Sequence, residues 1–374
     1  MILKKLYIHN YKSFYDTTIE LNKFNIIIGE NNSGKSNIID VLEFIDSMDN
    51  EDFIRAITQR GGFDKILNYN YNEEMFLLEL TLEEDNFLIK VRLTVKKEVN
   101  INTLVIYVNQ NDTLLPLAVR SIRNNIIIKR TKNKKFLHME NINMLNLFEK
   151  FVTLELKYLL LNIPYSLSQT YGFNTETIRN ESHKKSIINL QKDGSNLGKN
   201  LFEIKKNYPD SFESISNSMI GIINEIDGMD VRETFGNYLI GFYEKNQEIG
   251  IDMVSDGTIN LLATMTALNQ DEDKSILLAF DEPERYLHLK AVHYLLDSFR
   301  ASEKQILITT HSTEILKDAN LDEIIFIYRD SNGDTQSIKA SDIPDLEGKM
   351  KRLGYERPLS LDELIADGII GDFG

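Results

Sequence analysis

The sequence predicts an α/β fold with a mixed sheet, an antiparallel N-terminal part and an inserted, mainly helical lobe. Three features indicate this class: strand-like runs in the first part of the chain, helical spacing in the middle, and near-continuous apolar runs after residue 250. The 374 residues are enough for two domains, or for one large domain with an insertion. We expect an N-terminal part over residues 1–96, the inserted lobe over 97–250, a C-terminal part over 251–340 and a tail over 341–374.

The N-terminal part consists of short alternating or β-branched runs bounded by polar turns, which is typical of strands. These runs are LKKLYIHN, TTIELN, FNIIIG, EMFLLELTLEE and NFLIKVRLTV. One helix interrupts them from about Ser36 to Met48, directly after a glycine-containing loop, because its apolar residues recur at helical spacing. The order strand, loop, helix therefore occurs early in the chain.

The middle of the chain is rich in Asn, Lys and Leu, and runs such as MLNLFEKFVTLELKYLLL and FESISNSMIGIINEI have helical spacing. After it come SILLAF, QILITT and EIIFIY, which are apolar enough for parallel strands that are covered on both faces. Asn332 and Gly333 lie between the last of these and another strand-like run, which predicts a hairpin and an antiparallel edge.

Composition excludes several classes of protein. With 42 Lys and Arg against 57 Asp and Glu, the net charge is −15, which disfavours a protein that binds nucleic acid over its whole surface. The absence of cysteine excludes disulfides, thiolate metal sites and a cysteine nucleophile. No apolar run approaches the ~20 residues that span a bilayer, and the N-terminus does not resemble a signal peptide. We expect a cytoplasmic protein.

The segment from Gly29 to Ser36 fits the phosphate-loop pattern G-x-x-x-x-G-K-[ST] without a mismatch. Glycine allows the loop to turn its backbone N–H groups toward a phosphate, while Lys35 reaches the β- and γ-phosphates and Ser36 ligates Mg²⁺. The preceding strand and following helix match the context that this loop requires. The predicted nucleotide-binding residues are Gly29, Asn31, Asn32, Ser33, Gly34, Lys35, Ser36 and Asn37.

Two later strands end in polar residues that suit nucleotide hydrolysis. Asp281 and Glu282 follow the run SILLAF; the first suits the Mg²⁺ shell and the second suits the polarisation of an attacking water. His311 follows QILITT, and ligands of an open parallel sheet bind beyond the carboxyl ends of its strands. We predict Lys35, Glu282 and His311 as catalytic residues, with His311 sensing the γ-phosphate.

Ser255 and Gly257 precede another helical run, INLLATMTALN, and such a helix N-terminus can bind an anion. Taken alone, Ser-Asp-Gly is also common in turns and helix caps.

The order of these four motifs resembles that of an ATP-binding cassette ATPase, and most closely the RecF, SMC and overcoming-lysogenization-defect (OLD) branch. Similar segments are the N-terminal run through GENNSGKSNIID, the string LQKDGSNL at 190–197 and the string DEPERYLH at 281–288; the likeness covers residues 1–95 and 185–330. It implies that two heads enclose two ATP molecules, with Ser255 and Gly257 contacting the partner's γ-phosphate. It also implies that residues 283–288 cross the dimer interface.

The resemblance has two departures. The segment from Val254 to Gly257 corresponds to the signature motif of these ATPases, and it has Val254 and Asp256 at the first and third positions of the usual form Leu-Ser-Gly-Gly. In addition, no glutamine can be assigned to the loop that joins ATP to the helical lobe.

The resemblance to ATP-binding cassette ATPases also helps to exclude several functional classes. Ser36 and Ser255 are 219 positions apart (255 − 36), farther than in a transport subunit, and the long heptad arms of true SMC proteins are absent. The Asn-Lys-x-Asp motif that reads guanine does not occur, which disfavours a GTPase. The 63 residues after His311 are too few for the Toprim domain of an OLD-type nuclease. We expect an ATPase that senses or remodels DNA and controls a partner, such as a nuclease encoded nearby, in anti-phage defence or DNA repair. The alternative is a nucleotide-gated scaffold with little turnover.

One local feature indicates nucleic acid. Residues 120–135 contain seven basic and no acidic side chains. This basic stripe either follows a phosphate backbone or faces acidic neighbours as a solvated loop. Its members are Arg120, Arg123, Lys129, Arg130, Lys132, Lys134 and Lys135.

Overall fold

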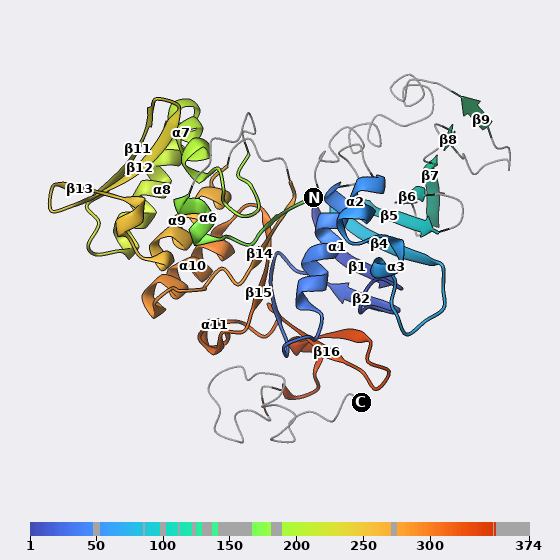
Figure 1. Ribbon diagram of the computed structural model, residues 1–374. Coiled ribbons are helices and arrows are strands. Elements are labelled where there is room, and N and C mark those ends of the chain that lie inside the picture. Colours follow the sequence, from blue (N-terminus) through green and yellow to red (C-terminus); the bar gives the residue numbers. More distant parts are fainter. Residues whose placement is uncertain are drawn as a thin grey trace.

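The structure is a computed structural model that describes residues 1–47, 53–84, 87–97, 102–110, 113–121, 125–128, 137–140, 167–180, 189–270, 275–346 and 348. Three sheets and their helices make up this part of the chain (Figure 1).

The main sheet has six strands, and five of them are parallel. The last strand pairs antiparallel with its neighbour through the turn at Asn332 and Gly333, so the expected parallel strands and hairpin are confirmed. In order across the sheet the strands are β10 (Ser168–Tyr171), β14 (Leu277–Asp281), β15 (Gln305–Thr310), β3 (Phe24–Ile28), β16 (Ile324–Arg329) and β17 (Thr335–Lys339).

The N-terminal sheet is antiparallel, as predicted, and has eight strands. Alternate residues of its first strand, such as Leu6 and Ile8, are buried against the core, which is the period-2 pattern of a half-covered sheet. In order its strands are β2 (Thr17–Glu20), β1 (Ile2–His9), β4 (Met75–Glu84), β5 (Phe87–Lys96), β6 (Asn102–Gln110), β7 (Thr113–Ser121), β8 (Asn125–Ile128) and β9 (Leu137–Glu140).

The expectation of a mainly helical segment over 97–250 is wrong for residues 228–250 and for the described residues between 102 and 140, which form strands. The strands β6 to β9 extend the N-terminal sheet there, because a β-branched run such as Val105 and Ile106 can pair with the open edge of β5. The predicted helical run at 144–161 lies outside the described residues. Helices do occur after residue 174, namely α6 (Thr175–Arg179), α7 (Leu197–Asn207) and α8 (Pro209–Ile222).

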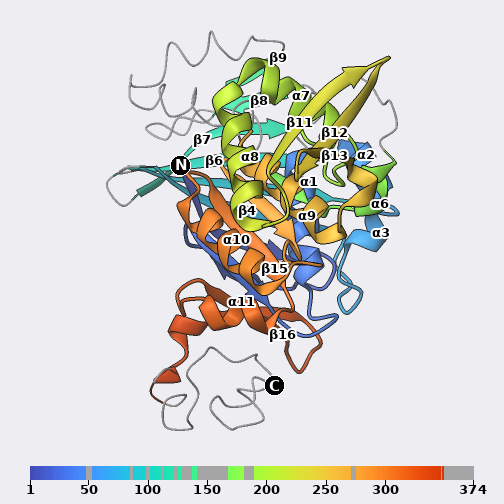
Figure 2. The same cartoon turned by 90° about the vertical axis from the view of Figure 1, so that its left-hand side faces the viewer.

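The two faces of the main sheet are covered by different layers (Figure 1). Ile27 and Leu307 lie in a core with α1 (Lys35–Ser47) and the N-terminal sheet. Ile308 and Phe280 lie in the opposite core. That second core includes α9 (Asp256–Leu268) and α10 (Leu289–Ala301), which Figure 2 places in front of the sheet together with α8.

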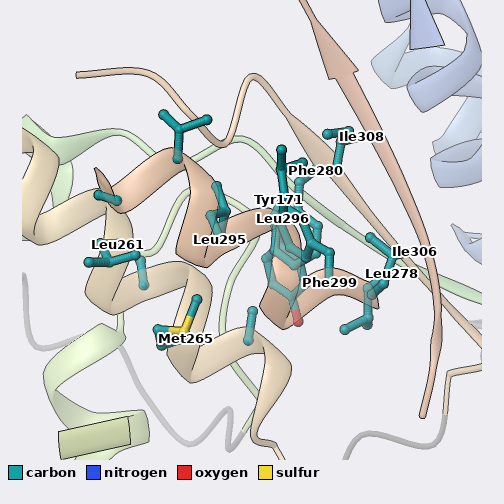
Figure 3. Close-up of a cluster of buried hydrophobic side chains, with 14 of the residues drawn as sticks. Tyr171, Leu261, Met265, Leu278, Phe280, Leu295, Leu296, Phe299, Ile306 and Ile308 are labelled. Atoms are coloured by element: carbon teal, nitrogen blue, oxygen red, sulfur yellow. The ribbon is translucent and has the colours of Figure 1, made fainter. Parts of the chain in front are cut away.

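Aromatic side chains fill much of the second core. Figure 3 shows Phe280, Phe299 and Tyr171 beside leucines of α10. Phe280 lies 5.1 Å from Phe299 and 5.2 Å from Tyr171 between ring centroids. This packing fixes β14 relative to its neighbour β10 and to α10.

A small antiparallel sheet packs on α7 and α8 and consists of β11 (Gly228–Thr234), β12 (Asn237–Glu244) and β13 (Gln247–Gly250). The remaining short helices are α2 (Phe53–Gln59), α3 (Phe63–Ile66), α11 (Thr313–Asp318) and two 3₁₀ turns at Ile251–Met253 and Ala340–Asp342. Within the part of the chain that the structure describes, every helix is too short or too polar to cross a bilayer.

Candidate functional site

The phosphate loop lies between β3 and α1, and two of its glycines are required by close contacts. A Cβ on Gly29 would lie 2.1 Å from the Ile327 carbonyl oxygen, so no larger residue fits. Gly34 has φ +116°, and a Cβ there would lie 2.5 Å from Thr335 Oγ1. The fold therefore allows only glycine at both positions.

Lys35 is buried within this loop and donates to the carbonyl oxygens of Gly29 at 2.8 Å and Glu30 at 2.7 Å. Burial lowers the pKa of its ammonium group, while the nearby charges of Glu282 and Asp281 act in the opposite direction. The lysine and the two carboxylates thus share one electrostatic environment, although they are about 250 positions apart in the sequence.

The loop also has unused hydrogen-bonding capacity that fits a phosphate group. Among the described residues, Ser33 Oγ is buried without a hydrogen-bond partner. Ser36 is exposed in the first turn of α1, and Asn31 and Asn32 are exposed beside it. A helix that starts directly after a glycine turn presents free backbone N–H groups to an anion.

Ser13 and Thr335 support the loop from outside. The Ser13 hydroxyl lies 2.8 Å from Thr335 Oγ1 and accepts a hydrogen bond of 2.7 Å from Asn37 Nδ2. Thr335 also donates to the Ser33 carbonyl at 2.7 Å, and Arg329 Nε donates to the Asn32 carbonyl at 3.0 Å. The loop is therefore held by the N-terminal part and by the β16–β17 hairpin together.

The acidic pair lies at the carboxyl end of β14. Asp281 accepts a hydrogen bond of 2.5 Å from Thr309 Oγ1, and Glu282 donates its backbone N–H to the Thr309 carbonyl at 3.0 Å. Glu282 has φ +47°, and its Oε1 lies 3.7 Å from His311 Nε2. Parallel pairing of β14 with β15 thus brings the predicted carboxylate and the predicted histidine together.

Ser255 is the N-cap of α9, and its Oγ accepts a hydrogen bond of 3.1 Å from the Thr258 N–H. Gly257 lies against residues 283–288, since a Cβ there would be 2.4 Å from the Tyr286 carbonyl oxygen. Asn260, one turn further, donates to the carbonyls of Pro283 at 2.9 Å and Arg285 at 3.0 Å. The signature segment and the predicted interface loop therefore form one unit within the chain.

A family model described as "AAA domain, putative AbiEii toxin, Type IV TA system" matches residues 24–133 and 151–317, which is most of the chain. The chain belongs to this family. Its members are P-loop ATPases, so the chain has the nucleotide-binding fold that the phosphate loop predicts. No curated protein matches the chain.

Solved structures resemble the fold of this AAA-domain family member. An SMC head bound to the C-winged helix domain of ScpA has a TM-score of 0.54 at 17% identity, with 98% of this chain and 100% of that chain covered. The SMC head domain from Thermotoga maritima has a TM-score of 0.49 at 17% identity, covering 91% and 99%. The recombination mediator protein RecF-ATPrS of the RecFOR pathway has a TM-score of 0.45 at 14% identity, covering 90% of this chain and 98% of that chain.

The family match and the first of these structures confirm the expected α/β P-loop fold with its N-terminal antiparallel sheet and mixed main sheet.

The loop after β10, the neighbour of β14, lies beside the acidic pair. A Cβ on Gly172 would be 3.8 Å from the Asp281 Cβ. The 190–197 string packs on the same loop, since Gly172 N–H donates to the Lys192 carbonyl at 3.0 Å. Gly172 and Phe173 begin this loop, directly after Tyr171 ends β10.

Other supporting residues had no local sequence signal. Arg179 contacts the signature loop from 72 to 77 positions away, which no motif could reveal. Asn260 carried a weak signal, because it is a lone amide in the apolar run INLLATM. Of the basic stripe, only the backbone of Arg120 lies in a described strand; the other six residues lie outside the described residues.

Proposed function

We propose that the chain hydrolyses ATP, dimerises around it, and couples the closed dimer to DNA sensing or remodelling or to the control of a partner effector. The observation that carries this proposal is the convergence of Lys35, Asp281 and Glu282 at one edge of the main sheet. Lysine, an Mg²⁺-ligating carboxylate and a water-activating carboxylate are the parts that phosphoryl transfer to water requires.

Each residue has a distinct role in this mechanism. Lys35 would leave the carbonyls of Gly29 and Glu30 and bind the β- and γ-phosphates. Ser36 and Asp281 carry the oxygen ligands for Mg²⁺, which would neutralise phosphate charge when bound. The hydroxyl of Ser36 at the start of a helix and the carboxylate of Asp281 at the end of a strand are oxygen ligands, which this hard cation prefers.

Glu282 would accept a proton from the attacking water while the oxygen of that water forms a bond to the γ-phosphorus. The bond between that phosphorus and the β–γ bridging oxygen breaks, so ADP and phosphate leave. His311, 3.7 Å from Glu282, would donate a hydrogen bond to the γ-phosphate and register its presence.

Exposed apolar side chains support a dimer in which Ser255 and Gly257 contact the partner's nucleotide. Met253 is 74% exposed just before the signature, and Tyr286 is 59% exposed in the loop against it. Leu289, at the start of α10, is 50% exposed. Exposed apolar surface around a binding loop is typical of a face that a second copy covers.

The test is the solution mass of Glu282→Gln with and without Mg-ATP, measured beside the ATP turnover of the unaltered protein. Loss of the water-activating carboxylate should slow turnover by about a hundredfold or more and trap an ATP-dependent dimer. Ser255→Arg in the same background should abolish that dimer. Glu225→Gln, an exposed change of the same chemistry, serves as the control.

Two outcomes would contradict the proposal in different ways. An unchanged turnover in Glu282→Gln would remove the catalytic assignment. A stable ATP-dependent assembly with negligible turnover in the unaltered protein would favour the nucleotide-gated scaffold.

The coupling to an effector has support of another kind. The family description names a putative toxin of a type IV TA system, and the SMC head in the comparison is bound to a domain of ScpA. Both support a function that involves a partner protein. Turnover that rises with added DNA would favour DNA sensing, in defence or in repair, and turnover that responds only to a protein partner would favour effector control.

A further inference from the structure

Arg179, the last residue of α6, binds the loop that leads into the signature. Its Nη1 donates to the Ile251 carbonyl at 2.6 Å, and its Nη2 donates to the Val254 carbonyl at 2.8 Å. The same Nη2 lies 2.8 Å from Asp256 Oδ1, so one guanidinium spans the whole turn before α9. The planar guanidinium presents its donors in a fixed fork that can reach acceptors spread along a turn, whereas an ammonium group presents its three donors from a single nitrogen.

Asp256 is the residue by which the signature departs from the usual Gly at its third position. Here its carboxylate is bound by Arg179 and by the side chain of Thr175, which lie four positions apart and so on the same face of α6. The departure therefore creates a link within the chain between the signature and a neighbouring helix.

The short helix α6 also begins near the nucleotide site. It follows β10 after the turn at Gly172, which lies beside Asp281, and Asn174 caps it by accepting a hydrogen bond from the Thr177 N–H at 2.9 Å. Along the chain, Arg179 therefore follows closely after Gly172, which lies beside Asp281 at the edge of the main sheet.

We propose that Arg179 is a positioning residue that keeps the 251–256 loop in the shape in which Ser255 and Gly257 can bind the partner's γ-phosphate. This inference rests on the proposed ATP-dependent dimer. The turn before α9 contains exposed residues, among them Asp252 and Met253, and its two carbonyls are bound by a side chain from another element. Preorganisation of such a loop lowers the entropy lost when the dimer closes.

The experiment compares Glu282→Gln with the double variant Glu282→Gln/Arg179→Ala. Three quantities are measured: the ATP-dependent dimer fraction against protein concentration, the affinity of the monomer for a fluorescent ATP analogue, and the melting temperature. The double variant should need about tenfold or more protein to dimerise, because three charge-assisted hydrogen bonds are lost. Its affinity for the analogue should stay within about twofold, because the phosphate loop belongs to other elements.

Two further variants make the test specific. Arg179→Lys should restore only part of the dimer, and Asp256→Ala should weaken it less than Arg179→Ala, because both carbonyl contacts remain. Arg232→Ala is the matched control: it removes an exposed arginine that pairs with Glu248 on the small sheet, and it should leave all three quantities unchanged.

The outcomes separate this inference from the function on which it rests. If Glu282→Gln itself forms no ATP-dependent dimer, the proposed function fails and the role of Arg179 fails with it. If Glu282→Gln dimerises and the double variant dimerises equally well, only the role of Arg179 is overturned. A joint loss of analogue binding, melting temperature and dimer would assign Arg179 to folding, which would also overturn its positioning role.

Discussion

At the scale of single residues, burial separates Glu284 from the two carboxylates before it. Its Oε1 accepts a hydrogen bond from Thr310 Oγ1, whereas its Oε2 is buried with no partner among the described residues. Burial raises the pKa of Glu284 to about 7, while the neighbouring charge of Glu282 adds to the shift. Asp281, in contrast, is exposed at the end of β14. A third carboxyl group of the site is therefore neutral or charged according to pH.

Glu284→Gln should alter how stability depends on pH. Because the pKa of the folded protein lies above the ordinary 4.5, the protonated group contributes stability that is fully present below about pH 4.5 and is lost as pH rises through about 7. The loss is of the order of 3 kcal/mol at most, at about 1.4 kcal/mol for each pKa unit.

Melting temperatures without nucleotide and Mg²⁺ from pH 5 to pH 8 would measure this effect. The unaltered protein should lose stability relative to Glu284→Gln over this range, while Glu225→Gln should follow the unaltered protein. Parallel curves for Glu284→Gln and the unaltered protein would contradict the prediction.

At the scale of elements, α9 and the 283–288 loop depend on each other. Asn260 is 5% exposed and uses both N–H groups of its amide to bind carbonyls of that loop. The loop requires such support because Glu282 and Tyr286 have positive φ. Residues other than glycine rarely adopt this backbone conformation unless surrounding contacts hold it. Helix α9 thus supports the backbone that follows Glu282.

Asn260→Ala should leave two carbonyls of the loop unbound, and destabilise the protein by about 1–3 kcal/mol. ATP turnover should fall by about tenfold, because Glu282 loses its fixed position. Asn269→Ala, at the C-cap of the same helix, is the matched control, since its side-chain amide donates to the Met265 carbonyl of α9 itself. Calorimetry and steady-state turnover measure both effects, and equal turnover in the two variants would contradict the role of Asn260.

At the scale of the whole molecule, the topology gathers the site at one edge. The parallel strands β3, β14 and β15 all end where the phosphate loop, the acidic pair and His311 begin. The helical layer brings α9 and its signature to the 283–288 loop that follows the acidic pair. With a net charge of −15, any contact with nucleic acid requires a local basic region such as 120–135.

Replacing Lys129, Arg130, Lys132, Lys134 and Lys135 with glutamine tests that region. If the stripe follows a phosphate backbone, DNA binding should weaken and its dependence on salt concentration should flatten, because fewer counterions are released. Changing Lys205 and Lys206 of α7 to glutamine serves as the control. Fluorescence anisotropy over a range of salt concentrations measures both slopes, and an unchanged slope would assign the stripe to a solvated loop.

Local patterns determined much of this protein. The strand, glycine loop and helix around Lys35 follow from neighbouring residues alone, as do the apolar runs before Asp281 and His311, because the period and composition of a segment set its conformation. The hairpin at Asn332 and Gly333 is equally local.

Only the tertiary structure decided which distant groups meet. Strands β6 to β9 joined the N-terminal sheet because β5 offers an open edge, a factor that no segment of 97–140 contains in itself. Arg179, Asn260 and Ser13 support the site through contacts far from their own neighbours in sequence. Local periodicity determines whether a segment forms a helix or a strand. Burial and hydrogen bonds between elements depend instead on where the whole fold places those elements, and the residues that support the site act through such contacts.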